Sequence, residues 1–284
     1  MAEIREFDVI VLGAGPAGEV CAGRLADNDM SVALIERDLV GGECSYYACM
    51  PSKALLRPAQ ALAETRRVPG AAEAAQAELD VTAVLRRRDE VVHDLDDSAQ
   101  LPWLEERSIV LVRGHGELAG EREVRVNDDV LRARRAVVLA PGSGAAIPPI
   151  PGLREADPWT NREVTTADAI PASLLVLGGG VVGVEMAQAY ASLGARVTVV
   201  EALPRLIAGE EQFASEMVRE ALHRAGVEVV LGVKATAVSR DGSGGARGPV
   251  TVELEDGRSF TGEELLAAVV RLLWPMSVNC PSGW

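Results

Sequence analysis

The sequence predicts an α/β protein built from two similar βαβ units. A G-x-G-x-x-G motif follows an apolar, strand-like run near the N-terminus, and the same motif recurs 165 residues later. In both copies an acidic residue, Glu36 or Glu201, lies 23 residues beyond the first glycine. Two copies in the order strand, glycines, helix, strand and acid indicate two Rossmann-like, three-layer dinucleotide-binding domains. The motif glycines are Gly13, Gly15 and Gly18, then Gly178, Gly180 and Gly183.

The first half of the chain carries further elements after its glycine motif. Pro51 suits the first turn of a helix, because a proline there loses no helical hydrogen bond. A Gly- and Pro-rich stretch at 140–152 predicts the domain boundary. In chain order, the predicted elements are a strand at 7–12, a helix at 17–28, a strand at 31–35, helices at 51–67 and 84–95, and strands at 109–112, 123–126 and 135–139.

The second half repeats this pattern around its own glycine motif. A helix is predicted at 213–225, and strands at 227–231 and 250–254. From about Val269 the run VVRLLWPMSVNCPSGW shows no clear period, so no domain is predicted there. The predicted division is a first domain at 1–148, a second at 149–268 and an aberrant tail at 269–284.

Composition limits the classes of partner. The chain has 284 residues, enough for two domains with cores, and its 48% hydrophobic and 25% charged residues are typical of globular proteins. A net charge of −14 disfavours nucleic acid and anionic lipid as partners. The N-terminus lacks a signal-peptide pattern, and no apolar run approaches the ~18 residues of a membrane span. We therefore expect a cytoplasmic protein.

Each motif glycine has a physical role at a phosphate site. The first permits a tight turn, the second lets the backbone approach a pyrophosphate, and the third lets helix and strand pack closely. The helix N-terminus adds N–H groups and a positive dipole end. A carboxylate at Glu201 accepts hydrogen bonds from ribose hydroxyls and repels a 2′-phosphate, which favours NAD over NADP. Two sites indicate two cofactors, and a flavin is a candidate for one of them, but spacing does not assign the sites.

A cysteine pair in GGECSYYACMPSK, residues 41–53, forms the second candidate site. Cys44 and Cys49 could be a redox disulfide, part of a metal site, or two buried thiols. No second cysteine pair lies nearby and the histidines are dispersed, so no metal site is predicted. A helix start at Pro51 and the cation of Lys53 both favour a thiolate, and a small disulfide loop is easily reduced.

The segment GGECSYYACMPSK resembles the redox motif G-G-x-C-x-x-x-x-C-x-P-S-K of the class I pyridine nucleotide-disulfide oxidoreductases. The order of the glycine motifs, the redox motif and LAPGS before IPPIPG is also similar, over roughly residues 6–268. The resemblance implies a flavoprotein disulfide reductase in which an NAD-binding domain is inserted into an FAD-binding domain.

The resemblance assigns FAD to the first glycine motif and NAD to the second. Pro141 departs from the pattern, because the family usually has threonine there. The implied FAD contacts are Gly13, Gly15, Gly18, Glu36, Gly42, Lys53, Gly116, Ala140, Gly142 and Ser143. The implied NAD contacts are Gly178, Gly180, Gly183, Glu201 and Ala235.

The resemblance also implies the catalytic residues. Hydride would pass from NADH to the flavin, which would open a Cys44–Cys49 disulfide through Cys49. Cys44 would then exchange with the substrate. Lys53 would lie beside the flavin and pair with Glu185. These four residues are the implied catalytic set.

Within the family, VVGVEMAQAYASLGARVTVVEALPRL is most similar to dihydrolipoamide dehydrogenase. The family continues into an interface domain that forms a homodimer and supplies a His-Glu pair, and we expect this chain to be C-terminally truncated before it. Expected substrates are small-molecule disulfides, dithiols or quinones, with no nucleic-acid or membrane partner. The alternative is a dinucleotide-binding protein with diaphorase activity on quinones or dyes, or with none.

Overall fold

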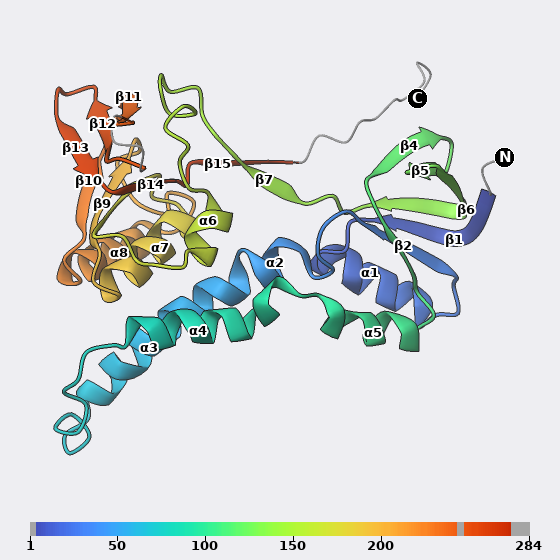
Figure 1. Ribbon diagram of the computed structural model, residues 1–284, viewed down its shortest axis with the longest axis horizontal. Helices are drawn as coiled ribbons and strands as arrows, with labels where there is room; N and C mark the ends of the chain where they lie inside the picture. The colour runs from blue at the N-terminus through green and yellow to red at the C-terminus, as the bar shows by residue number, and fades with distance from the viewer. Residues whose placement is uncertain (1–3, 243–246, 274–284) are drawn as a thin grey trace. The chain divides into compact units, whose positions relative to one another are not determined.

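The computed structural model describes residues 4–242 and 247–273 of the chain (Figure 1). The described residues fall into two compact units. Unit 1 comprises residues 4–50, 92–144 and 272–273. Unit 2 comprises residues 51–91, 145–242 and 247–271.

Helices and strands alternate along most of the chain. The helices are α1 (Pro16–Ala26), α2 (Gly42–Tyr46), α3 (Cys49–Arg66), α4 (Val81–Val91), the short 3-10 helices η1 (His93–Leu95) and η2 (Ser98–Gln100), α5 (Leu101–Glu106), α6 (Asn161–Thr166), α7 (Val181–Ser192) and α8 (Gln212–Arg224). The strands are β1 (Ile4–Leu12), β2 (Val32–Glu36), β3 (Val110–Arg113), β4 (Gly116–Gly120), β5 (Glu123–Val126), β6 (Asp129–Leu139), β7 (Ser143–Ala146), β8 (Ser173–Leu177), β9 (Arg196–Glu201), β10 (Glu228–Leu231), β11 (Ala235–Arg240), β12 (Val250–Leu254), β13 (Ser259–Gly262), β14 (Glu264–Ala267) and β15 (Val270–Leu273).

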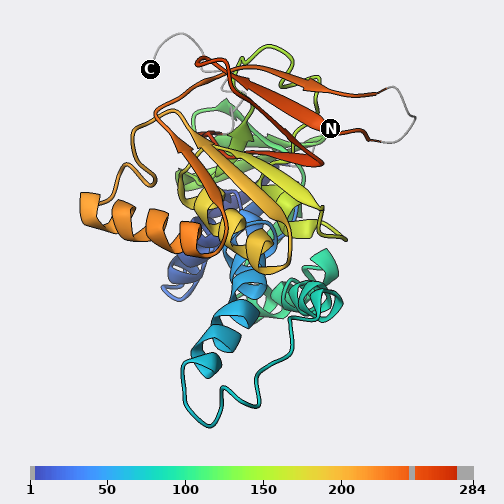
Figure 2. The same ribbon diagram turned by 90° about the vertical axis from the view of Figure 1, so that its left-hand side faces the viewer.

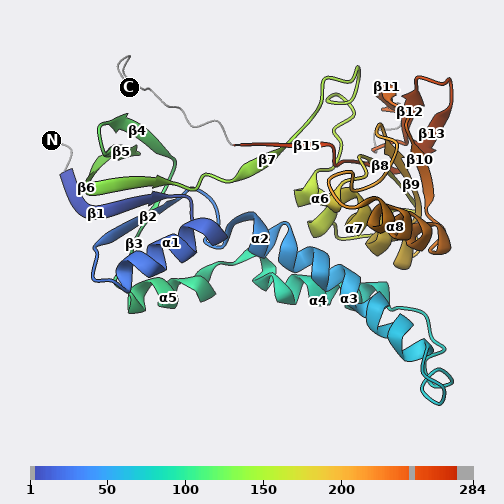
Figure 3. The same cartoon turned by 180° about the vertical axis from the view of Figure 1, so that it is seen from behind.

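The sheet of unit 1 has the strand order β3-β2-β1-β6-β5-β4. Strands β3, β2, β1 and β6 run parallel, and β5 and β4 continue the sheet antiparallel. Alternate residues of β1 face opposite sides of this sheet, as the period of a strand requires. Ile10 packs in one cluster with Val124 of β5, and Val11 packs in another with Ala22 of α1. In Figure 3, α1 and α5 lie along one face of the sheet, and β4 and β5 curl over the other.

The main sheet of unit 2 is wholly parallel, in the order β10-β9-β8-β14. Leu174 and Val176 of β8 face a core shared with α7 and α8, whereas Leu175 and Leu177 face the antiparallel layer β11-β12-β13. Figure 2 shows the helices on one side of the sheet and this layer on the other. Strands β7 and β15 form a separate two-stranded sheet. The predicted α/β class with two three-layer dinucleotide-binding folds is confirmed.

Several predicted elements have different bounds in the structure. The helix predicted at 51–67 begins at Cys49, because Pro51 is accepted within a first turn whose N–H groups lack helical partners. The helix predicted at 84–95 spans Val81–Val91, and the positive φ values of His93, Asp94 and Leu95 keep the following η1 from continuing it. Strand β6 begins at Asp129 rather than 135, and β4 and β7 were not predicted.

The compact units do not coincide with the predicted domain bounds. They divide between residues 144 and 145, and residues 51–91 belong to unit 2. Leu55 and Leu56 of α3, with Leu85 of α4, pack in the unit 2 core, which explains that assignment. The functional division at 148 and 268 stays a prediction. Residues 274–284 of the predicted tail lie outside the described residues, whereas 270–273 form β15.

Candidate active site

The first glycine motif forms the turn between β1 and α1 in unit 1. Gly13 has a φ of +98°, and a Cβ there would lie 2.1 Å from the carbonyl oxygen of Ala140. Gly18 is equally constrained, since its Cβ would lie 1.8 Å from the carbonyl oxygen of Gly13. Gly15 differs: a Cβ built on it would have no atom of the described chain within 4 Å. Gly13 and Gly18 therefore serve packing, and the space beside Gly15 is open for a ligand.

Glu36 closes this turn from the end of β2. Its Oε2 accepts a hydrogen bond from the Ala14 amide at 2.7 Å, and its Oε1 accepts one from the Asp38 amide at 2.8 Å. Each carboxylate oxygen keeps acceptor capacity for a further donor, such as a ribose hydroxyl. Burial raises the pKa of the neighbouring Glu19 carboxyl, and the charge of Glu36 adds to that rise.

The second glycine motif repeats this geometry in unit 2. A Cβ at Gly183 would lie 1.9 Å from the Gly178 carbonyl oxygen, whereas a Cβ at Gly180 would have 4 Å of clearance from every described residue. Glu201 accepts hydrogen bonds from the amides of Gly179 at 2.6 Å and Leu203 at 2.7 Å. Each turn thus has its own packing glycines, its own open glycine position and its own carboxylate.

The cysteine segment begins against the first turn. The amide of Gly41 donates to the carbonyl oxygen of Ala14 at 2.8 Å. Gly42 has a φ of +60°, and a Cβ on it would lie 2.8 Å from the Gly15 Cα. Cys44 follows within α2 and is half-buried, and Cys49 is the exposed first residue of α3. The backbone that leads to Cys44 therefore packs against the first glycine turn, while the Cβ direction of Gly15 stays open.

Lys53 and Glu185 form an ion pair within unit 2. The Lys53 Nζ lies 2.6 Å from Oε1 of Glu185, so the predicted pairing is present. The side chains are 60% and 26% exposed, respectively, so the pair is open to solvent. Lys53 lies four residues after Cys49 in α3, and residues at that spacing share one face of a helix. Cys49 and Lys53 therefore point from the same face of α3.

A family model for pyridine nucleotide-disulphide oxidoreductases matches residues 7–271, which include both glycine turns and the cysteine segment. This chain belongs to the pyridine nucleotide-disulphide oxidoreductase family. The family implies a flavin and a nicotinamide as cofactors. The open positions at Gly15 and Gly180, each at a helix N-terminus and each beside a carboxylate, fit two dinucleotides.

Curated relatives include dihydrolipoyl dehydrogenases and mercuric reductases. The chain is 31% identical to the dihydrolipoyl dehydrogenase of Acholeplasma laidlawii, over 80% of this chain and 68% of that protein. It is 35% identical to the dihydrolipoyl dehydrogenase of Chlorobaculum parvum, over 81% and 50% of the two chains. A mercuric reductase of Bacillus cereus is 29% identical, over 84% of this chain and 38% of that protein. The chain spans about half the length of several of these relatives.

A solved structure supports the same family fold. The HOCl-induced flavoprotein disulfide reductase RclA from Escherichia coli is similar to this chain with a TM-score of 0.80 and 25% identity. The similarity covers 96% of this chain and 58% of that protein.

The other residues that the sequence analysis assigned to the cofactors lie in several parts of the fold. Gly116 begins β4, and a Cβ there would lie 2.2 Å from Cδ2 of Leu12, so a larger residue would displace the Leu12 side chain. Ala140 donates its amide to the Leu12 carbonyl oxygen at 2.8 Å and so adjoins the first turn. Gly142 and Ser143 follow at the start of β7. Ala235 begins β11 in unit 2. Their cofactor roles stay predictions.

Arg205, the first basic residue after Glu201, is engaged by its own loop. Its guanidinium donates to the carbonyl oxygens of Ala208 and Glu210, each at 2.6 Å. The buried Leu206 beside it fills the space that a side chain at Gly179 would need, with 2.5 Å between that Cβ and Cδ2 of Leu206. The loop after β9 therefore packs onto the second glycine turn.

Two residues that sequence reasoning missed, Asp97 and Arg113, contact the chain between Glu36 and α2. Asp97 Oδ2 accepts from the Val40 amide at 2.7 Å and from Arg113 at 2.5 Å. Arg113 also donates to the Asp38 carbonyl oxygen at 2.6 Å. No sequence signal marks either residue, because Asp97 is distant in sequence from the segment that it holds.

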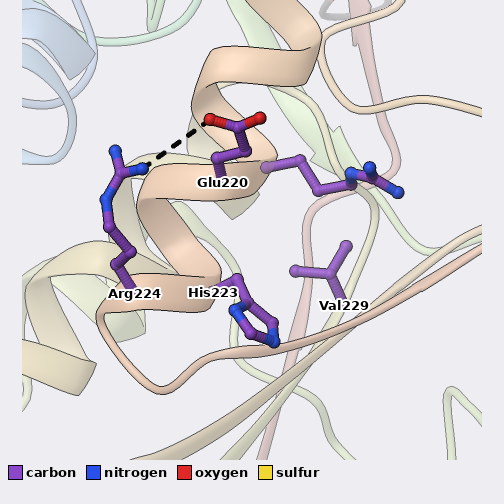
Figure 4. Close-up of a pocket in the computed structure, with 5 residues that line it drawn as sticks. Glu220, His223, Arg224 and Val229 are labelled. Atoms are coloured by element: carbon purple, nitrogen blue, oxygen red, sulfur yellow. Dashed lines mark ion pairs between the residues drawn. The ribbon is translucent and has the colours of Figure 1, made fainter.

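A separate hollow lies in unit 2. A hollow of about 500 Å³ at α8 and β10 is lined by Arg219, Glu220, His223, Arg224 and Val229 (Figure 4). Its Arg224 forms an ion pair with Glu220 at 3.7 Å, and no predicted site residue lines it. Across 4–242 and 247–273, no cluster of three or more metal-binding side chains occurs. In the same ranges, no helix has the length and apolarity of a membrane span.

Proposed function

We propose that this protein is an FAD-dependent, NADH-linked disulfide oxidoreductase similar to dihydrolipoyl dehydrogenase, with Cys44 and Cys49 as its redox pair. The observation that carries this proposal is the contact of the cysteine segment with the first of two dinucleotide turns. Gly42 lies so close to Gly15 that a Cβ on it would be 2.8 Å from the Gly15 Cα. The segment that bears Cys44 thus starts against the turn that would bind a cofactor pyrophosphate.

The first turn would hold FAD, and the second would hold the nicotinamide. A bound flavin supplies a carrier that accepts a hydride from NADH and delivers two electrons to a disulfide. The N-terminal amides of α1 would bind the pyrophosphate beside Gly15, and the carboxylate of Glu36 would accept from ribose hydroxyls. In unit 2, α7, Gly180 and Glu201 would do the same for the nicotinamide cofactor.

The chain's own residues then divide the disulfide chemistry. A disulfide between Cys44 and Cys49 would take up two electrons from the reduced flavin, with two protons, and become two thiols. Cys49 would be the thiol that faces the flavin, and Cys44 would exchange with a substrate disulfide. Lys53 shares the helix face of Cys49, so its ammonium would stabilise negative charge there, and Glu185 fixes its position.

Two features favour NADH over NADPH. The Glu201 carboxylate faces the second turn and would repel a 2′-phosphate. The Arg205 guanidinium, which could otherwise attract that phosphate, donates to the carbonyl oxygens of Ala208 and Glu210. These hydrogen bonds restrain the guanidinium within its own loop.

A thiol titration tests the proposal. The full chain is loaded with FAD, treated with NADH without oxygen, and titrated for thiols after denaturation. We expect two new thiols, lost in Cys44→Ser and in Cys49→Ser and retained in Cys21→Ser, which removes a cysteine of α1. Loss of flavin colour without new thiols would instead support the diaphorase function. A chain that binds no FAD would contradict both.

A further inference from the structure

The segment 37–42 links two parts of the proposed flavin site. It begins directly after Glu36, the ribose acceptor, and ends at Gly42, the first residue of α2. Its inner side is held by the first glycine turn, through Gly41 to Ala14 and through the close approach of Gly42 to Gly15. A shift of this segment would therefore move the carboxylate and the helix of Cys44 together.

The outer side of the segment is held by Asp97 and Arg113. A single carboxylate oxygen, Oδ2 of Asp97, accepts from the Val40 amide and from the Arg113 guanidinium. Arg113 spans further to the carbonyl oxygen of Asp38. The segment is thus bonded on its outer side at two backbone positions, one as donor and one as acceptor.

The hydrogen bonds to Asp97 are strengthened by the burial of its carboxylate. The Asp97 residue is 9% exposed, and hydrogen bonds to charged groups in such places are stronger than those between neutral groups. Arg113 is anchored independently, because it ends β3, which pairs in register with β2 up to Glu36. Arg113 therefore ties the segment to the sheet, and Asp97 ties it to the loop between η1 and η2.

We propose that Asp97 and Arg113 are positioning residues for flavin binding, which set the place of Glu36 and of the Cys44 helix through segment 37–42. This inference rests on the proposed FAD function. Asp97 and Arg113 act through the backbone of Val40 and Asp38, which they contact directly.

The test compares three variants of the full chain. Asp97→Ala removes both bonds to Oδ2, and Asp97→Asn keeps an acceptor for Val40 without the charge. Glu123→Ala is the matched control, because it breaks a 2.6 Å ion pair with Arg132 in the same unit but away from the segment. FAD affinity is measured by quenching of flavin fluorescence, and amide hydrogen exchange is measured without FAD.

We expect Asp97→Ala to raise the dissociation constant for FAD at least about tenfold, with Asp97→Asn between it and the native chain. Without FAD, Asp97→Ala should speed exchange of the segment amides, and Glu123→Ala should leave both measurements unchanged. Native FAD affinity in Asp97→Ala would overturn the positioning role and leave the proposed function intact. If the native chain bound no FAD, the proposed function would fail. Unchanged amide exchange in Asp97→Ala would separately refute the claim that Asp97 holds segment 37–42.

Discussion

At the residue scale, the position of the Lys53 ammonium determines what this residue contributes. It lies one helical turn beyond Cys49, and Glu185 fixes its ammonium at 2.6 Å. Because the Lys53 side chain is 60% exposed, the pair adds little to folding, and exposed pairs contribute at most about 1 kcal/mol. The pair therefore serves mainly to position the compact Lys53 ammonium, whose shape differs from the planar guanidinium of arginine.

Replacement of Lys53 should separate catalysis from stability. We expect Lys53→Met to slow flavin reduction by NADH about tenfold or more, with the thermal midpoint nearly unchanged, because a positioned charge is lost from an exposed pair. Arg57→Met is the matched control, since it breaks an exposed ion pair of α3 with Glu64 at 3.2 Å. Equal reduction rates in the two variants, measured by stopped flow, would remove Lys53 from the mechanism.

Tyr190 gives unit 2 a dependence on alkaline pH. Its hydroxyl is buried and donates to the Val164 carbonyl oxygen at 2.7 Å, and burial raises the pKa of Tyr190 well above its usual value. Above about pH 10 an unfolded tyrosine loses a proton that the folded one keeps. Stability is therefore present below that pH and falls as pH rises toward the folded pKa.

The Tyr190→Phe variant tests this dependence. At neutral pH it should cost about 1 kcal/mol, since the bond to Val164 is lost. Above about pH 10 its thermal midpoint should fall less steeply than that of the native chain, because no buried phenol must ionise on unfolding. Parallel pH profiles for the two proteins would show that another group causes the alkaline loss.

The candidate site residues that the sequence marks most clearly are those whose chemistry constrains the residue type. The glycines, Glu36, Glu201 and the cysteines are marked by spacing, because a tight turn or a phosphate approach tolerates few alternatives. Asp97 could not be predicted in this way. The Val40 amide needs a buried acceptor, and Asp97 supplies it from a part of the chain that is distant in sequence.

At the element scale, each glycine turn uses different glycines for packing and for the proposed ligand binding. In each turn the third glycine is enclosed by backbone and the second faces open space. The same chemical change, addition of one methyl group, therefore has a different consequence at the two positions.

This difference is testable in the first turn. Gly18→Ala should lower the free energy of unfolding by about 1–3 kcal/mol or more, because its Cβ would collide with the Gly13 carbonyl oxygen. Gly15→Ala should keep stability within about 1 kcal/mol and weaken FAD binding, since the methyl group would occupy the open position. Calorimetry and FAD titration separate the two effects, and equal loss of stability would contradict this division.

Gly183→Ala and Gly180→Ala repeat the experiment in the second turn. The first should destabilise unit 2, and the second should weaken NADH binding while FAD binding is unchanged. An FAD defect in Gly180→Ala would show that the two turns are not assigned to separate cofactors.

Element bounds failed where local signals were weak or misleading. Arg132 and Arg134 alternate with buried Leu131 and Ala133, so β6 extends through a charged run that hid its period. The helix predicted to residue 95 ends at Val91, because the backbone is left-handed from His93 to Leu95. No glycine marks this change in the sequence.

At the scale of the whole molecule, the sequence predicted the fold class from one repeated pattern. It did not predict that α3 and α4 would belong to unit 2, because this depends on Leu55, Leu56 and Leu85 finding a core distant in sequence. As a result, the helix that starts at Cys49 continues into the unit that holds Glu185.

The central claim is that this chain holds a flavin whose electrons reach Cys49. The most direct measurement is the visible spectrum of the FAD-loaded chain before and after NADH without oxygen. The account predicts a yellow protein that gains a long-wavelength band from the Cys49 thiolate beside the flavin, kept in Cys44→Ser and lost in Cys49→Ser. A colourless protein, or bleaching without that band in the native chain, would contradict it.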